Sequence, residues 1–379
     1  MNKFFQNLFA LTFASLIVGG STYLLKDKIL NYYANSLDSL YKTNNLQSDL
    51  ESGKIIVFGS SELLNIKQKF IPQNFFNNDL QIPLRVHGNE GHQEFAIMSQ
   101  LAAYDNNAVR ENAKVVIMLS PSWFTGTSDN GTRISKFLEF MYTGMMSKLY
   151  FQSTADKEFK LAVDSYIRKN IDLIKEPTYI YSQTYEQLRQ SDTCLDRLTK
   201  KIIMNYIDYK NTNIQKIDYI APKLDWESLR VEAKNVALPS TNNNFGISND
   251  YYSRYVEPSI QKGEFPFNII LSSELDTNQE YQDFLMLLKL LKNYKIKPLF
   301  VMQDLHPSIF VNNRESMNKL VSKIKSDVLE YGYDYYDMWS YDEKNFEVGS
   351  LVDMVHLGEL GWLRVDQKII EHFMSPKGN

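Results

Sequence analysis

Two short segments near opposite ends of this 379-residue chain carry side chains that could act on an ester bond. The Gly-Ser-Ser-Glu segment at 59–62 follows a short apolar run, and Asp353 stands three residues before His356, close to the C-terminus. A serine hydroxyl is a weak nucleophile at neutral pH, so it needs a base to remove its proton and a third group to orient that base. The two segments supply all three groups, which makes serine-based acyl transfer the leading hypothesis.

Each segment also has a purely structural interpretation. A serine that precedes a helix commonly caps it, and an aspartate and a histidine in a loop could be a helix cap and an exposed side chain. The three-residue spacing nevertheless lets Asp353 accept a hydrogen bond from one imidazole nitrogen while the other nitrogen faces a serine. The sequence therefore predicts a Ser-His-Asp triad in which His356 serves Ser60 or Ser61.

Further loops could complete the site. Gly91 lies in the Gly-Asn-Glu-Gly-His-Gln loop 88–93, where a glycine could present its backbone N–H to a developing oxyanion or simply allow a turn. Ser122 lies in the Ser-Pro-Ser-Trp-Phe segment 120–124, where a polar side chain could provide another donor. The Asp-Leu-His-Pro segment 304–307 is expected to line the wall of the pocket.

Apolar runs that alternate with helical stripes indicate how these loops are positioned. Such short runs are typical of parallel strands buried on both faces, and their alternation with helices predicts an α/β domain with a mostly parallel sheet and helices on both faces. Ligand sites in such sheets form at the carboxyl ends of strands, where Ser60 and Ser61 stand. Residues 125–260 have mainly helical spacing, which predicts a large helical insertion in the same domain. The expected strands cover residues 55–58, 82–86, 115–119, 298–302 and 333–339.

The N-terminus has an apolar run long enough to span a membrane. No charged residue occurs from Leu8 to Leu25, and about 20 apolar residues suffice for a transmembrane helix. We therefore expect a membrane anchor with a short cytoplasmic end at 1–30, a polar stalk at 31–52 and the catalytic domain at 53–379. A cleaved signal peptide is the alternative, because residues 18–21 are Val-Gly-Gly-Ser. Either interpretation places the domain at or beyond a membrane.

Composition excludes several other classes of protein. A content of 44% hydrophobic and 23% charged residues is typical of a globular chain, and the net charge of -4 gives no reason to expect nucleic acid as a partner. The single cysteine, Cys194, excludes an intrachain disulfide and a multi-cysteine metal site. His87 and His92 flank Glu90, but their spacing matches no zinc motif, and no P-loop or dinucleotide glycine pattern occurs.

Taken together, these segments resemble the SGNH (GDSL-like) hydrolases, and more closely the DltD family of D-alanyl transfer proteins of teichoic acid modification. The resemblance covers most of the chain, including the N-terminal apolar run, and depends on the order and spacing of several segments. These are Phe-Gly-Ser-Ser-Glu-Leu at 58–63, Gly-x-x-Gly-x-Gln at 88–93, Leu-Ser-Pro-x-Trp-Phe at 119–124, Asn-Asn-Phe-Gly-Ile at 243–247 before Tyr251 and Tyr252, and Asp-x-x-His-Leu-Gly-x-x-Gly-Trp at 353–362.

The resemblance implies a flavodoxin-like SGNH fold and assigns the catalytic roles. Ser61 matches the nucleophile, and Ser60 stands where the SGNH pattern has aspartate. His356 would then be the base, and Asp353 would orient its imidazole.

The same match assigns the surroundings of the nucleophile. The amides of Ser61 and Gly91 would stabilise the oxyanion, and Gln93 belongs to the matching Gly-x-x-Gly-x-Gln loop that would contact substrate. Ser122 falls where many SGNH enzymes carry asparagine, which weakens the third oxyanion donor. The Gln-Asp-Leu-His-Pro segment 303–307 differs from the asparagine-glycine loop of many relatives, which concerns substrate detail rather than reaction class.

The family also implies a setting. It implies a single-pass protein of the bacterial cell membrane with its catalytic domain outside, which transfers D-alanine onto lipoteichoic acid. The implied partners are a multispanning membrane O-acyltransferase of the DltB kind, a D-alanyl carrier protein of the DltC kind and the teichoic acid polymer. No metal or organic cofactor is required by this chemistry.

Two other functions use the same residues. An SGNH esterase or thioesterase would pass the acyl group from the serine to water, and would release free D-alanine faster than it esterifies a polyol. A non-catalytic adaptor would bind the acyltransferase or the carrier, and a Ser61→Ala variant would then retain full teichoic acid acylation. The departure at Ser122 keeps the adaptor interpretation open.

Overall fold

A computed structural model of the chain describes residues 46–126, 130–141, 143–151, 153–173, 215–269 and 275–374, together with a few isolated positions before residue 46. The expected anchor at 1–30 and most of the expected stalk at 31–52 lie outside the described residues. None of the helices within the described ranges is long and apolar enough to cross a membrane.

Five parallel strands form the centre of the domain. Their spatial order, β2-β1-β3-β4-β5, is that of flavodoxin-like sheets. This confirms the predicted α/β class with a parallel sheet, and each strand begins and ends within two residues of its predicted range. The strands are β1 (Ile55–Gly59), β2 (Leu84–Gly88), β3 (Lys114–Leu119), β4 (Leu299–Met302) and β5 (Asp334–Asp337).

Strand β1 shows why these segments are unbroken apolar runs. All five of its residues are buried. Ile56 and Phe58 belong to the apolar cluster on one face of the sheet, whereas Ile55 and Val57 belong to the cluster on the other face. Successive side chains of a strand point to opposite faces, so a strand covered by helices on both sides must be apolar throughout.

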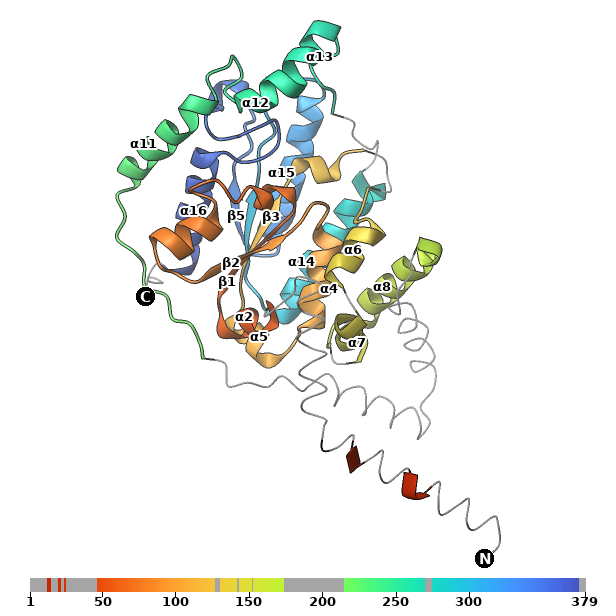
Figure 1. The fold of residues 1–379 in the computed structure, drawn as a ribbon. Helices are drawn as coiled ribbons and strands as arrows, with labels where there is room; N and C mark the ends of the chain where they lie inside the picture. Colours follow the sequence, from red (N-terminus) through yellow and green to blue (C-terminus); the bar gives the residue numbers. More distant parts are fainter. Residues whose placement is uncertain are drawn as a thin grey trace, which may run out of the picture.

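Helices cover both faces of the sheet, as Figure 1 shows. One face is covered by α2 (Leu46–Ser52), α4 (Glu94–Ala103), α5 (Asn107–Asn112), α14 (Gln279–Tyr294) and α15 (Arg314–Glu330). The other face is covered by α11 (Trp226–Ala237), by α16 (Glu359–Phe373) and by the segment 70–76, which contains α3 (Pro72–Asn74). The sheet therefore lies between two layers of helices, and the loops that connect strands and helices lie at the two ends of the strands.

The described part of 125–260 consists of helices and loops and contributes no strand to the sheet. Its helices α6 and α7 pack against α4, while α11 packs against α16. The segment is thus joined to both faces of the α/β domain rather than folded separately. Its helices are α6 (Ile134–Phe140), α7 (Thr143–Phe151), α8 (Lys157–Lys169), α11, α12 (Asn249–Tyr251) and α13 (Glu257–Lys262), the last of which ends just beyond the predicted insertion.

Helix α2 differs from the expected stalk. Leu46 and Leu50 are fully buried in the main apolar cluster, because their spacing of four residues places both on the face that packs against α5. Asp49 also binds Arg85 and Lys54 in ion pairs of 2.9 and 2.5 Å. The globular domain therefore begins at residue 46 or earlier, and the end of the expected stalk is part of its core.

Candidate active site

The predicted site residues meet at the carboxyl ends of β1, β2 and β3. Ser60 and Ser61 directly follow β1, and a single 3-10 turn, η1 (Ser61–Leu64), begins at Ser61. Gly91 lies in the loop after β2, and Ser122 lies in the turn η3 (Pro121–Phe124) after β3. Because parallel strands end at the same edge of a sheet, three loops distant in sequence converge there. His356 comes from the loop before α16.

A chain of hydrogen bonds connects the predicted nucleophile, base and acid. Ser61 Oγ lies 2.9 Å from His356 Nε2, and His356 Nδ1 lies 2.7 Å from Asp353 Oδ2. The second carboxylate oxygen, Asp353 Oδ1, accepts hydrogen bonds of 2.8 Å from the backbone N–H groups of Val355 and His356. The turn thus fixes the carboxylate, the carboxylate fixes the imidazole, and the imidazole faces Ser61.

The electrostatics of this chain suit proton transfer from the serine. Burial works against ionised Asp353, but its bonds to the imidazole and to two amides outweigh that effect and hold the pKa of Asp353 below its ordinary value. Burial lowers the pKa of His356, while the bond to Asp353, the charge of Asp353 and the charge of Glu62 raise it, and the net pKa is raised. When Nδ1–H of neutral His356 donates to Asp353, Nε2 is left to accept the Ser61 proton.

Ser60 has a different environment from Ser61. Its hydroxyl accepts a hydrogen bond of 2.9 Å from the backbone N–H of Gly91 and donates to the carbonyl of Asn89 at 3.2 Å. The side chain is buried, with 3% of its surface exposed, and ties the loop after β1 to the loop after β2. Of the two candidate nucleophiles, only Ser61 is hydrogen-bonded to His356 within the described residues.

The hydrogen bond between Gly91 and Ser60 also affects the predicted oxyanion hole. The N–H of Gly91 was expected to face an oxyanion, but here it points at Ser60 Oγ. Gly91 has a φ of +74°, a conformation that favours glycine. Ser122 Oγ lies 2.8 Å from Ser120 Oγ, so its hydroxyl is shared with a neighbour, whereas the side-chain amide of Gln93 has no hydrogen-bond partner among the described residues.

A cavity of about 530 Å³ opens beside these groups. It is lined by Ser60, Ser61, Gly91, Gln93, Ser122 and Trp123, and by parts of the segments 125–126 and 130–136. All the residues predicted to surround the oxyanion therefore share one cavity with the predicted nucleophile. Its size is in the range of small-molecule binding sites.

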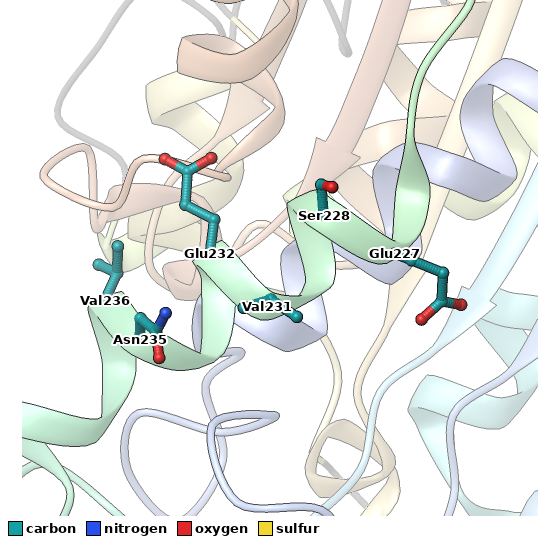
Figure 2. Close-up of a pocket in the computed structure, with 6 residues that line it drawn as sticks. All are labelled: Glu227, Ser228, Val231, Glu232, Asn235 and Val236. Carbon is teal, nitrogen blue, oxygen red and sulfur yellow. The ribbon is translucent and has the colours of Figure 1, made fainter.

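A second hollow, of about 620 Å³, lies along the outer face of α11. Figure 2 shows that its lining side chains, among them Ser228, Val231 and Val236, all project from this one helix. Ser228 Oγ is bound to Asp225, and no histidine lines the hollow. It contains none of the predicted site residues, so the cavity beside Ser61 is the candidate active site.

Two buried side chains hold the peptide unit between Gly59 and Ser60, one residue before the predicted nucleophile. The carbonyl of Gly59 lies 3.0 Å from His92 Nδ1, and the N–H of Ser60 donates to Glu62 Oε1 at 2.6 Å. His92 is fully buried and Glu62 is 3% exposed. The Gly59–Ser60 peptide is thus gripped at both its acceptor and its donor, which fixes the direction in which Ser61 leaves the strand.

The histidines that flank Glu90 take part in this support. The amide of Gln100 lies 2.9 Å from His92 Nε2 and 3.0 Å from His87 Nε2. With the amide nitrogen of Gln100 turned toward His92 Nε2, the one N–H of a neutral His92 ring is on Nδ1 and donates to the carbonyl of Gly59. Burial lowers the pKa of His92 to about 4 and that of His87 well below its ordinary value, so both rings are neutral at pH 7. No group of three metal-ligating side chains occurs in the described ranges.

The Asp-Leu-His-Pro segment 304–307 supports the loop of the predicted base instead of lining the cavity. The backbone N–H of His306 donates to the carbonyl of Met354 at 2.9 Å, next to Asp353. His306 Nε2 lies 2.7 Å from the carbonyl of Phe245, and Asp304 is paired with Arg314 at 3.1 Å. We expected this segment to form a wall of the pocket. The cavity beside Ser61 is not lined by it.

Comparison of the sequence with known proteins identifies relatives. A family model described as DltD protein matches residues 30–374, which include every residue of the site. The chain belongs to the DltD family. It is 23% identical to Protein DltD of Staphylococcus aureus (strain NCTC 8325 / PS 47) over 384 residues, with 93% of this chain and 90% of the relative covered.

Two further relatives carry the same name. Protein DltD of Bacillus subtilis (strain 168) is 22% identical over 390 residues, with 96% of this chain and 95% of the relative covered. Protein DltD of Lacticaseibacillus rhamnosus is 22% identical over 286 residues, with 68% of this chain and 64% of the relative covered. The similarity to the first two extends over nearly the full length of both chains.

Proposed function

We propose that this protein is a membrane-anchored serine acyltransferase that moves D-alanyl groups onto teichoic acid. Membership of the DltD family supports the pathway, since DltD proteins belong to the D-alanylation of teichoic acid. The observation that carries the proposal is the hydrogen-bonded chain Ser61–His356–Asp353, because a hydroxyl within 2.9 Å of a carboxylate-oriented imidazole is the arrangement that activates serine.

In the proposed first step, Ser61 Oγ attacks the carbonyl carbon of a D-alanyl ester or thioester. His356 Nε2 takes the hydroxyl proton as the new C–O bond forms. The tetrahedral intermediate then collapses, the bond to the leaving oxygen or sulfur breaks, and His356 returns the proton to that atom. The product is a D-alanyl ester of Ser61, while ionised Asp353 stabilises the imidazolium throughout.

The proposed second step repeats this sequence with a polyol hydroxyl as nucleophile. His356 takes the proton of the acceptor hydroxyl, the ester bond to Ser61 breaks, and the proton returns to Ser61 Oγ. Both steps develop an oxyanion next to the Ser61 amide. The Gly91 N–H is the second proposed donor, and it reaches the oxyanion if the Ser60 hydroxyl moves aside. Removal of one such donor costs roughly 3–4 kcal/mol of barrier in well-studied hydrolases.

The location and the partners are also part of the proposal. A transmembrane helix within residues 1–30 would place the domain on the outer face of the cell membrane, where the polymer is found. The proposed partners are the multispanning O-acyltransferase and the D-alanyl carrier protein that would bring activated D-alanine to that face. Support for them comes from the family alone.

The proposal is tested by the D-alanyl ester content of teichoic acid in cells. Cells that lack the protein are complemented with the native chain, with Ser61→Ala and with Ser60→Ala, and membrane levels of each are matched by immunoblot. We expect Ser61→Ala to abolish the esters and Ser60→Ala to reduce them only in part. Full ester content with Ser61→Ala would instead favour an adaptor, and rapid release of free D-alanine by the purified native chain would favour a hydrolase.

A further inference from the structure

The cavity beside Ser61 carries two basic side chains that the triad does not use. Arg133 and Lys136 line the same cavity of about 530 Å³ as Ser61. Arg133 immediately precedes α6, and Lys136 lies in the first turn of that helix, so both cations come from one short stretch of chain. Two positive charges in the cavity would weaken the binding of a cationic substrate, so they indicate that the cavity also binds a ligand of another charge.

Both cations are able to bind a ligand. The guanidinium of Arg133 is exposed and has no hydrogen bond or ion pair with any described residue. Lys136 Nζ has one partner, Glu139 Oε1 at 3.2 Å, and an ammonium has three donors. The stem of Lys136 covers the Gly91 loop so closely that a Cβ on Gly91 would lie 2.9 Å from Lys136 Cγ. The stem of Lys136 therefore passes directly over the loop proposed to bind the oxyanion.

The charges in the cavity differ in which proposed substrate they would attract, the D-alanyl group or the acceptor chain. A D-alanyl group carries a protonated amine at neutral pH, and Arg133 and Lys136 would repel it. Glu90 is the one carboxylate that lines the cavity among the described residues, and it has no ion pair there. Opposite charges attract and like charges repel each other. Glu90 would therefore attract the amine of the acyl group, whereas the two cations would attract an anionic acceptor.

We propose that Arg133 and Lys136 form a subsite for a phosphodiester of the acceptor chain, next to the polyol hydroxyl that attacks the Ser61 ester. The inference rests on the proposed function, which makes a polyol phosphate polymer the acceptor. Guanidinium and ammonium groups are the usual partners of phosphate oxygens in proteins. The unpartnered amide of Gln93 in the same cavity offers a donor and an acceptor for the neighbouring hydroxyl.

Binding is measured directly, without chemistry. A fluorescein-labelled oligomer of glycerol phosphate is titrated with the purified full chain in a non-ionic detergent, and its anisotropy gives the Kd. The variant is Arg133→Gln/Lys136→Gln, and the control is Lys319→Gln, which removes an exposed positive charge from α15 away from the cavity. Melting temperatures verify that all three proteins are folded. Because no acyl transfer is needed, an unreactive Ser61 would refute the proposed function and leave this measurement interpretable.

We expect the double variant to weaken oligomer binding at least tenfold and the control to stay within twofold of the native chain. Equal binding by the native chain and the double variant, or no binding by the native chain, would overturn the subsite. A phospholipid headgroup offers the same phosphodiester, so dihexanoylphosphatidylglycerol below its micelle concentration is used as competitor. Displacement of the oligomer by this lipid at concentrations lower than those of unlabelled oligomer would assign the subsite to lipid and overturn the acceptor role.

Discussion

Replacement of His92 by leucine should slow acylation of Ser61 by about 10- to 100-fold while the protein remains folded. The peptide between Gly59 and Ser60 is held by His92 Nδ1 at its carbonyl, 3.0 Å away, and by Glu62 Oε1 at its N–H, 2.6 Å away. Leucine fills a similar volume but donates no hydrogen bond. The peptide is then free to rotate about the remaining contact, and Ser61 loses its alignment with the base.

The expected size of the effect follows from two costs. A buried carbonyl left without its donor destabilises the folded state by about 1–3 kcal/mol. A displacement of a reacting atom by about 1 Å costs on the order of 100-fold in rate, because the two reacting groups must meet within a narrow range of distance and angle. The loss in rate should therefore be larger than the loss in folded fraction, which stays negligible well below the melting temperature.

The assay is the pseudo-first-order rate of labelling by a fluorophosphonate, measured on the full chain together with its melting temperature. His87→Leu is the matched control, because His87 shares the Gln100 amide but does not contact the Gly59 carbonyl. It should lose stability and label close to the native rate. His92→Asn should recover part of the rate, since the asparagine nitrogen occupies nearly the position of Nδ1. If His92→Leu loses stability like His87→Leu and labels at the native rate, the positioning role is wrong.

Three further predictions concern the same edge of the sheet. Labelling of Ser61 requires neutral His356, whose pKa is raised above its ordinary value, so the rate should increase as pH rises through this raised pKa. Asp353→Asn removes the main raising influence, should shift the profile to lower pH and should reduce the maximum by roughly 10⁴-fold, which a pH–rate series checks. Glu62→Gln retains an oxygen for the Ser60 amide but loses the charge that raises the pKa of His356, so its profile should shift to lower pH with a smaller change in maximum; an unshifted profile would show that this charge has no influence. Gly88→Ala places a Cβ 2.0 Å from the carbonyl oxygen of Gly59, so thermal denaturation should show that the free energy of unfolding falls by about 1–3 kcal/mol or more. A native melting curve would mean that the ends of β1 and β2 can move apart without cost.

Asp353 and His356 should make the stability of the folded protein depend on pH in two ways. The pKa of Asp353 is depressed in the folded state, so its contribution is present above the unfolded pKa and is lost as pH falls through the folded pKa. The pKa of His356 is raised, so its contribution is present below the unfolded pKa and is lost as pH rises through the folded pKa. Melting temperatures of the native chain and His356→Gln should therefore converge at alkaline pH.

The sheet was predictable because its strands are locally encoded. The runs Ile55–Gly59 and Lys114–Leu119 are apolar at every buried position, since helices cover both of their faces. The boundary between stalk and domain was not predictable in the same way. Leu46 and Leu50 form too short an apolar stripe to indicate a core helix, and they are buried because α2 packs against β1 and against α5, which is distant in the sequence.

The convergence of the candidate site residues was predictable from their types, but the contacts that support them were not. Ser61, Asp353 and His356 stand in loops after or before recognisable elements, so their types and spacing indicated a triad. The grip of His92 on the Gly59 carbonyl joins residues 33 positions apart, and no local pattern marks such a bond. Glu62 offered a signal that was missed, since a carboxylate one or two residues into a helical turn commonly binds the preceding amides.

The most direct test of an activated serine is the site of covalent labelling by a fluorophosphonate in the full chain, located by peptide mass spectrometry. We predict one adduct, on Ser61, that is absent in His356→Ala. An adduct on Ser60 would contradict the assigned nucleophile. Labelling of Ser61 that persists at the native rate in His356→Ala would refute the proposed triad, because the hydroxyl would then be reactive without its base.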